Sequence, residues 1–226
     1  MYKIKMLRGT IFCAPINYSK KFVDSLSGLV DGYMPLLVRD NGALPILPVW
    51  QLTSPDEKEV LAFAGDKIDF VSMVEQEMDD AGIKVFADRC KAIFEKIVTV
   101  TGNICTRVAF APSTIITEGR EPPSELFSRL FNIRRFGESQ LASSNVSQVY
   151  RVSKRIGAKD VTINHVANFH VVSEMQDISR IRECYLCDFD INTAASPDNK
   201  FTESDINDFF DNAPDYFKTF FHVYSA

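Results

Sequence analysis

The residues best suited to hold a metal ion are two cysteines and two histidines in the last third of the chain. Cys184 and Cys187 are three positions apart, and His165 and His170 precede them. Zinc needs four ligands that converge tetrahedrally, usually from a Cys-x-x-Cys turn that points both sulfurs inward. Here both pairs fall in alternating strand patterns, where positions three or five apart face opposite sides of a sheet. The pattern therefore predicts no metal site and no cofactor, with His165 in the core.

A second candidate is a polar face shared by three predicted strands in the same part of the chain. With turns near Gly157 and residues 176–179, the strand register places Arg151 beside Asn164 and Asn164 beside Asp190. Such a row could bind a polar ligand, or two carboxylates could hold a divalent ion while one acts as a base. The alternative is a solvated sheet face with ordinary cross-strand pairs. The candidate ligand-binding residues are Arg151, Asn164, Asn168, His170, Asp188 and Asp190.

Charge is unevenly distributed along the second half of the chain. Basic residues dominate from 129 to 159, where Glu138 is the one acid, and acidic residues dominate from 188 to 215, where Lys200 is the one base. A basic patch on a sheet can bind phosphates of nucleic acid. The alternative is that the acidic final helix neutralises the patch within the molecule. The candidate nucleic-acid contacts are Arg134, Arg135, Lys154 and Arg155.

Composition narrows the class of protein. The chain has 226 residues, 46% of them hydrophobic, and a net charge of −5, which argues against a protein built wholly around a polyanion. No apolar stretch is long enough to span a membrane, and five scattered cysteines in a chain without an export signal indicate reduced thiols in the cytoplasm. No nucleophile, nucleotide-binding or zinc-protease motif is present, so the sequence favours a protein that is not an enzyme.

The elements that position these residues follow a similar order twice. The first half predicts a strand (2–13), a helix (18–30), a short strand candidate (33–39), a three-stranded meander (47–73) and a long helix to about residue 98. Ser72 with Glu75 offers a capping box for that helix, and Gly82 is expected to interrupt it.

The second half repeats the pattern. It predicts a strand (104–117, broken at Pro112), a helix opened by residues 122–124, three strands (147–155, 160–173 and 181–192) and a helix (202–224). Thr202 is the expected N-cap of the last helix, and Pro214 within its apolar stripe predicts a kink or a restart.

The fold class that follows is α+β. We expect two similar β-α-β-β-β-α halves, residues 1–101 and 102–226, whose antiparallel meanders pack against the long helices of one compact unit. In the first meander, turns at residues 54–57 and at Gly65-Asp66 set the register. That register predicts one row of Trp50, Leu61 and Phe70, with Phe63 and Ile68 beside it. An ancient internal duplication is a hypothesis supported by this order alone.

Three segments resemble a sporadically distributed family of prokaryotic proteins that has no assigned activity. They are WQLTSPDEKEVLAFAGDKID (50–69), NICTRVAF (103–110) and the Phe-rich final helix. Members of that family have a hairpin led by Trp or Phe near residue 50, a mid-chain strand with an arginine and a late Phe in the C-terminal helix. The resemblance implies a cytoplasmic α+β protein and carries over no chemistry.

The sequence thus favours a non-enzymatic protein-binding or regulatory module of a bacterium or phage, acting on another protein or by self-association through a sheet face, a sheet edge or the last helix. Two alternatives stay open: nucleic-acid binding through the basic patch, and a metal-dependent enzyme on the polar face of the second meander.

Overall fold

The computed structural model describes residues 2–38, 49–74, 79–116, 145–177, 180–196 and 198–225. Nine strands and three helices lie within these ranges. In chain order they are β1 (Tyr2–Phe12), α1 (Lys20–Ser25), β2 (Met34–Val38), β3 (Val49–Thr53), β4 (Glu59–Ala64), β5 (Lys67–Met73), α2 (Asp80–Thr101), β6 (Arg107–Ile116), β7 (Asn145–Ile156), β8 (Lys159–Asp177), β9 (Arg180–Thr193) and α4 (Glu203–Ser225).

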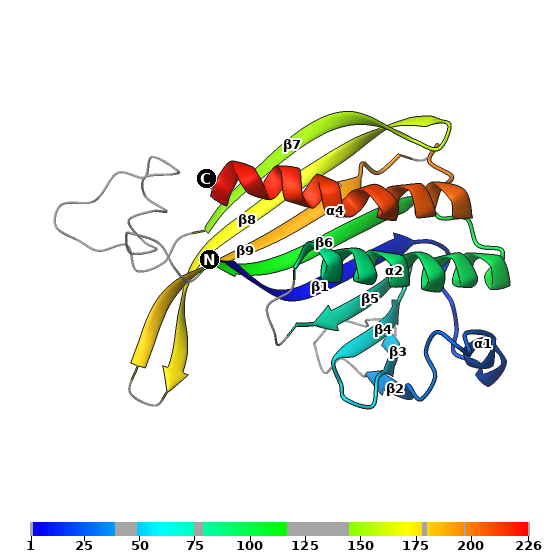
Figure 1. Cartoon of the computed structure of the whole chain (residues 1–226). Coiled ribbons are helices and arrows are strands. Elements are labelled where there is room, and N and C mark those ends of the chain that lie inside the picture. The colour runs from blue at the N-terminus through cyan, green and yellow to red at the C-terminus, as the bar shows by residue number, and fades with distance from the viewer. Residues whose placement is uncertain are drawn as a thin grey trace, which may run out of the picture.

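All nine strands belong to one antiparallel sheet with the order β2-β3-β4-β5-β1-β6-β9-β8-β7 (Figure 1). The first strands of the two halves, β1 and β6, pair at the centre, and each half extends the sheet outward on its own side. The α+β class and the antiparallel strand pairing are confirmed. The three-stranded meander predicted for residues 47–73 is confirmed as β3, β4 and β5, and the short strand predicted at 33–39, now β2, extends it to four strands by pairing with β3. The internal duplication and the boundary after residue 101 stay predictions.

The two long helices cover one face of the sheet and run antiparallel to each other (Figure 1). Their direction follows from their contacts: Asp80 at the start of α2 pairs with Lys218 late in α4, whereas Thr99 at the end of α2 bonds to Glu203 at the start of α4. Their apolar stripes meet the inward side chains of the strands in a single core rich in phenylalanine. The short helix α1 extends this core by packing Phe22 edge-on against Trp50 and Phe63.

Capping residues define where the long helices begin. Asp79 is the N-cap of helix α2, and its side chain accepts a hydrogen bond from Gly82 N at 2.9 Å. The predicted capping box of Ser72 and Glu75 is therefore wrong, since Ser72 lies within β5, and Gly82 belongs to the first turn and does not interrupt the helix.

The last helix agrees better with the sequence. Thr202 Oγ1 accepts from Asp205 N, and the Asp205 carboxylate accepts in return from Thr202 N at 2.8 Å. Helix α4 continues past Pro214 to Ser225 without a restart. In the strand before it, Pro112 does not break β6, because it pairs with Leu7 of β1.

Turn chemistry explains the strand register. The two-residue hairpin at Gly65-Asp66 is confirmed, and so is the turn at Gly157; both glycines have the positive φ that such turns require. The loop at Ser54 is longer than predicted, since Ser54 N still donates to Glu59 O at 2.9 Å. Trp50 therefore pairs with Phe63, while Leu61 faces Phe70 as expected.

Candidate functional site

The sheet face opposite α2 and α4, termed the open face, carries the polar residues of strands β6 to β9. Alternation along β8 sends Ile163, His165 and Ala167 toward the helices, where they are buried, and sends Asn164 and Asn168 to the open face. All six predicted ligand-binding residues lie on this open face.

One polar row of the open face is a chain of side-chain hydrogen bonds. Arg151 pairs with Asn164 in the register, and its Nε donates to Asn164 Oδ1 at 3.3 Å. Asn164 Nδ2 then donates to Asn192 Oδ1 at 3.0 Å. The predicted neighbour of Asn164 was Asp190, and this is wrong by two residues because β9 pairs with β8 in a different register. A shift of two leaves every side chain on its predicted face.

A second polar row contains Asp188, Asn168 and His170. Asp188 lies opposite Asn168, accepts a hydrogen bond from the Ser113 hydroxyl, and has one carboxylate oxygen 3.9 Å from His170 Nε2. Ser113 is buried and was not singled out from the sequence. The partners of Asp188 are thus a hydroxyl and an imidazole, which is an arrangement that orders a polar surface.

Metal binding finds little support in this geometry. Within the part of the chain that the structure describes, no three His, Cys, Asp or Glu side chains are grouped so that they could hold a metal ion. Cys187 is buried on the helix side of the sheet, where burial raises the pKa of its thiol, while His170 lies on the open face. The side chain of Cys184 lies outside the described residues.

The outer edge of the sheet is the second candidate surface. Strand β7 pairs with β8 on one side, and no other described strand pairs with it. Three of its apolar residues are exposed: Val149 at 53%, Tyr150 at 46% and Val152 at 40%. Tyr150 is held edge-on against Phe220 of α4, with ring centroids 5.7 Å apart, so this part of the edge is ordered by the core.

Strand β7 also carries the described part of the basic patch. Arg151 and Arg155 occupy the open face, whereas Lys154 points to the helix side, 5.4 Å from the Tyr216 ring. Two further candidates, Arg134 and Arg135, lie outside the described residues.

The predicted neutralisation by the last helix is confirmed for one basic residue at the tip of the β7–β8 hairpin. Lys159 forms an ion pair with Asp205 of α4. Gly157 N donates to Asp208 of the same helix at 2.8 Å. These two contacts hold the hairpin against the start of α4.

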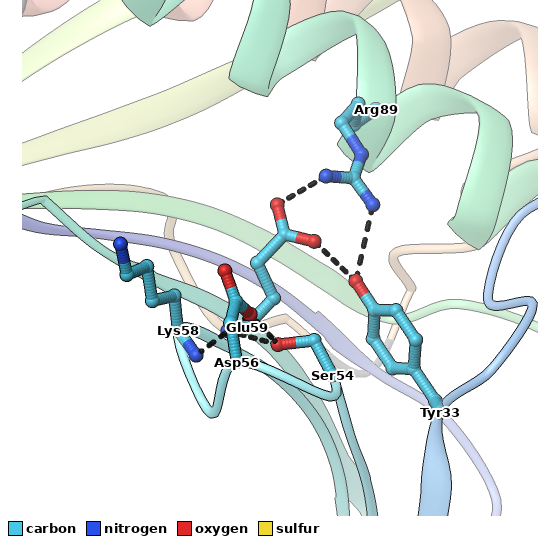
Figure 2. Close-up of polar contacts among 6 residues, drawn as sticks. All are labelled: Tyr33, Ser54, Asp56, Lys58, Glu59 and Arg89. Carbon is cyan, nitrogen blue, oxygen red and sulfur yellow. Dashed lines mark hydrogen bonds and ion pairs between the residues drawn. The ribbon is translucent and has the colours of Figure 1, made fainter.

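A third polar cluster lies between α2 and the first meander (Figure 2). Arg89 of α2 bonds to Glu59 of β4 and to the Tyr33 hydroxyl, which in turn donates to Glu59. The guanidinium carbon also lies 5.2 Å from the centroid of the Phe70 ring. Burial raises the pKa of Tyr33 to about 12, so its phenol stays protonated at neutral pH. With each partner satisfied by the others, this cluster fastens the helix to the sheet.

Beside this cluster, the loop that precedes Glu59 is ordered by short-range bonds. Ser54 Oγ donates to Asp56 Oδ1 at 2.6 Å and accepts from Glu59 N at 2.9 Å, while Lys58 N donates to the same Asp56 oxygen (Figure 2). Glu57 adopts a left-handed conformation with a φ of 60°. These contacts explain why this loop is longer than the tight turn expected from the sequence.

Comparisons of the sequence with known proteins found no match. No protein-family model matches the chain, and no curated protein matches it. Among the described residues, no helix is long and apolar enough to cross a membrane.

Proposed function

We propose that this protein is a non-enzymatic binding module whose edge strand β7 pairs with an extended acidic segment of another protein. The observation that carries the proposal is the twelve-residue length of β7 together with an outer side that no described strand pairs. An edge strand presents a row of unpaired N–H and C=O groups, and proteins that bind by strand addition use such a row for affinity.

The chemistry of β7 favours an acidic partner. The strand contains Arg151, Lys154 and Arg155 and no acidic residue. Directly opposed charges of opposite sign stabilise a strand pair, and like charges destabilise it. Antiparallel pairing of two copies of β7 would bring these cations together, so a second copy of the chain is the weaker partner. Exposed Val149 and Val152 add apolar contacts to a partner strand with alternating side chains.

The strand at the opposite edge of the sheet, β2, is less suited than β7 to pairing with another chain. Strand β2 is five residues long and contains Pro35, which lacks the N–H that strand pairing requires. Short edges and edge prolines are devices that oppose pairing with other chains. Exposed Leu36 and Leu37 therefore serve as control positions for the test below.

We further propose that the module acts in the cytoplasm of a bacterium or of a phage-infected cell. Support comes from the cysteines: Cys13, Cys90, Cys105 and Cys187 are free thiols buried in the structure. Free buried thiols are usual in a reducing compartment.

The test is fluorescence polarisation with labelled peptides of alternating valine and glutamate. We expect the acidic peptide to bind with an affinity that falls as salt rises, and a lysine counterpart to bind more weakly by at least about tenfold. Methylation of alternate peptide amides should abolish binding, because it removes the donors that strand pairing uses.

Variants locate the contact. The double substitution Arg151→Gln and Arg155→Gln should weaken peptide binding, whereas Leu36→Thr on β2 should not. If methylated and unmethylated peptides bind equally, strand addition is wrong. If no peptide binds and a single-stranded oligonucleotide binds through Arg151 and Arg155, the basic strand is instead a nucleic-acid contact.

A further inference from the structure

One row of the open face contains two charged side chains among apolar ones. The strand registers place one residue of each of seven strands, from β4 to β7, in the row. Ala111 and Asp190 are not themselves a ladder pair, but the pairs on either side, Phe110 with Ile191 and Ser113 with Asp188, place them opposite each other. The row consists of Val60, Val71, Arg8, Ala111, Asp190, Val166 and Val149. Arg8 and Asp190 thus lie on either side of the small side chain of Ala111, which is buried.

Both charged side chains of this row contain a buried polar atom without a partner. Arg8 Nε and Asp190 Oδ1 are screened from solvent and make no hydrogen bond. Each of the two residues as a whole is only partly buried. Leaving a buried donor or acceptor unpaired is costly, and buried polar atoms in folded proteins nearly always have partners.

The adjacent rows of the same face do not share this property. On one side, Thr10 Oγ1 donates to Asp69 at 2.6 Å, and Asp69 also pairs with Lys67 at 2.8 Å. On the other side, Asp188 is bonded to Ser113. The unpaired atoms are therefore a local feature of the row that contains Arg8 and Asp190.

Strand spacing explains why Arg8 and Asp190 can share a ligand. Their strands, β1 and β9, are both neighbours of β6, so their Cα atoms are roughly 10 Å apart. Within the described part of the chain the two side chains form no ion pair with each other or with another residue. Ala111, the residue between them, is buried and contributes only a methyl group, so Arg8 and Asp190 are the two polar residues of the row that a bridging molecule would contact.

We propose that Arg8 and Asp190 bind a small zwitterion of the α-amino acid class. The guanidinium presents a fork of donors that matches a carboxylate, and the Asp190 carboxylate accepts hydrogen bonds from an ammonium group. Val71 and Val166, which flank the charged pair in the row, offer contacts to an aliphatic side chain. This site is separate from the β7 edge, so the proposal can be tested independently of the proposed function.

Calorimetric titration of the full chain with L-valine tests the proposal. We expect L-valine to bind, and we expect both N-acetyl-L-valine, which lacks the ammonium group, and L-valinamide, which lacks the carboxylate, to bind at least about tenfold more weakly. If none of the three binds, or if the blocked forms bind as well as L-valine, the proposed ligand class is wrong.

A matched pair of variants locates the site. Asp190→Asn keeps the shape of the side chain and removes its charge, while Asp188→Asn makes the same change two residues away on the same strand and face. We expect Asp190→Asn to weaken L-valine binding by at least about tenfold and Asp188→Asn to leave it unchanged. Arg8→Gln should act like Asp190→Asn, with circular dichroism to verify folding. Equal effects of the two aspartate variants would overturn the assignment.

Discussion

Gly9 of β1 lies directly against the thiol of Cys90 of α2. A Cβ atom at position 9 would be 2.5 Å from Cys90 Sγ, 3.2 Å from the Phe94 ring and 3.3 Å from the Phe210 ring. Both long helices therefore approach the centre of the sheet as closely as a glycine permits.

Gly9→Ala is expected to destabilise the protein by about 1–3 kcal/mol, because an added methyl group in a packed core forces its neighbours to shift. Cys90→Ala removes the nearest atom, so the double variant should recover part of the loss. Urea denaturation of the four proteins in this cycle measures the coupling, and strictly additive effects would contradict the contact.

Gly157→Ala is expected to destabilise more than Gly65→Ala, although both glycines open two-residue hairpins with positive φ. Nothing lies within 4 Å of a Cβ at Gly65, so that change carries only the left-handed strain of about 1–2 kcal/mol. A Cβ at Gly157 would also collide with Asp205 Oδ1 and disturb both its pair with Lys159 and the cap of α4. Thermal denaturation compares the two variants, and equal losses would show that the clash is relieved without cost.

Arg89→Met is expected to lower the free energy of unfolding by about 1–3 kcal/mol, because it leaves the Glu59 carboxylate and the Tyr33 hydroxyl without their shared partner. Lys91→Met is the matched control on the same helix. Its partners Asp88 and Asp211 are exposed, so its loss should stay within about 0.5 kcal/mol. Denaturant titration that gave equal losses would mean that the cluster in Figure 2 does not fasten α2 to the sheet.

His165 is expected to make stability depend on pH. Burial, with a smaller effect of Lys154, lowers the pKa of the imidazole below its usual 6.5 in the folded state. The unfolded chain therefore takes up the proton first as pH falls. The part of the folding stability that depends on a neutral His165 is fully present above about pH 6.5. It is lost progressively below that value, as pH approaches the lowered pKa of the folded state.

His165→Phe removes this titration and keeps a ring against Phe220, which lies 5.2 Å away between centroids. The variant also removes a buried Nε2 that has no hydrogen-bond partner. We expect the loss of stability between about pH 7 and pH 5 to be smaller in this variant than in the wild type, as measured by urea denaturation at both values. An unchanged difference would assign the pH dependence to other groups.

Local sequence determined which residues form strands and helices and which face each strand residue occupies. Alternation of apolar and polar residues is a property of consecutive positions, so Asn164 and Asn168 could be assigned to the open face without any partner strand. Gly65 and Gly157 likewise indicate the positions of two turns, because the turn geometry needs a residue that tolerates positive φ.

Register and strand order depend on contacts that the local pattern does not contain. The loop after Ser54 is longer than the predicted turn, and this moved the partner of Trp50 from Leu61 to Phe63. The row of Arg8, Ala111 and Asp190 exists only because β6 lies between β1 and β9. Arg8 by itself is one charged residue in an N-terminal strand; the strand order brings it within reach of Asp190, because packing of the whole sheet against two helices selects which strands become neighbours.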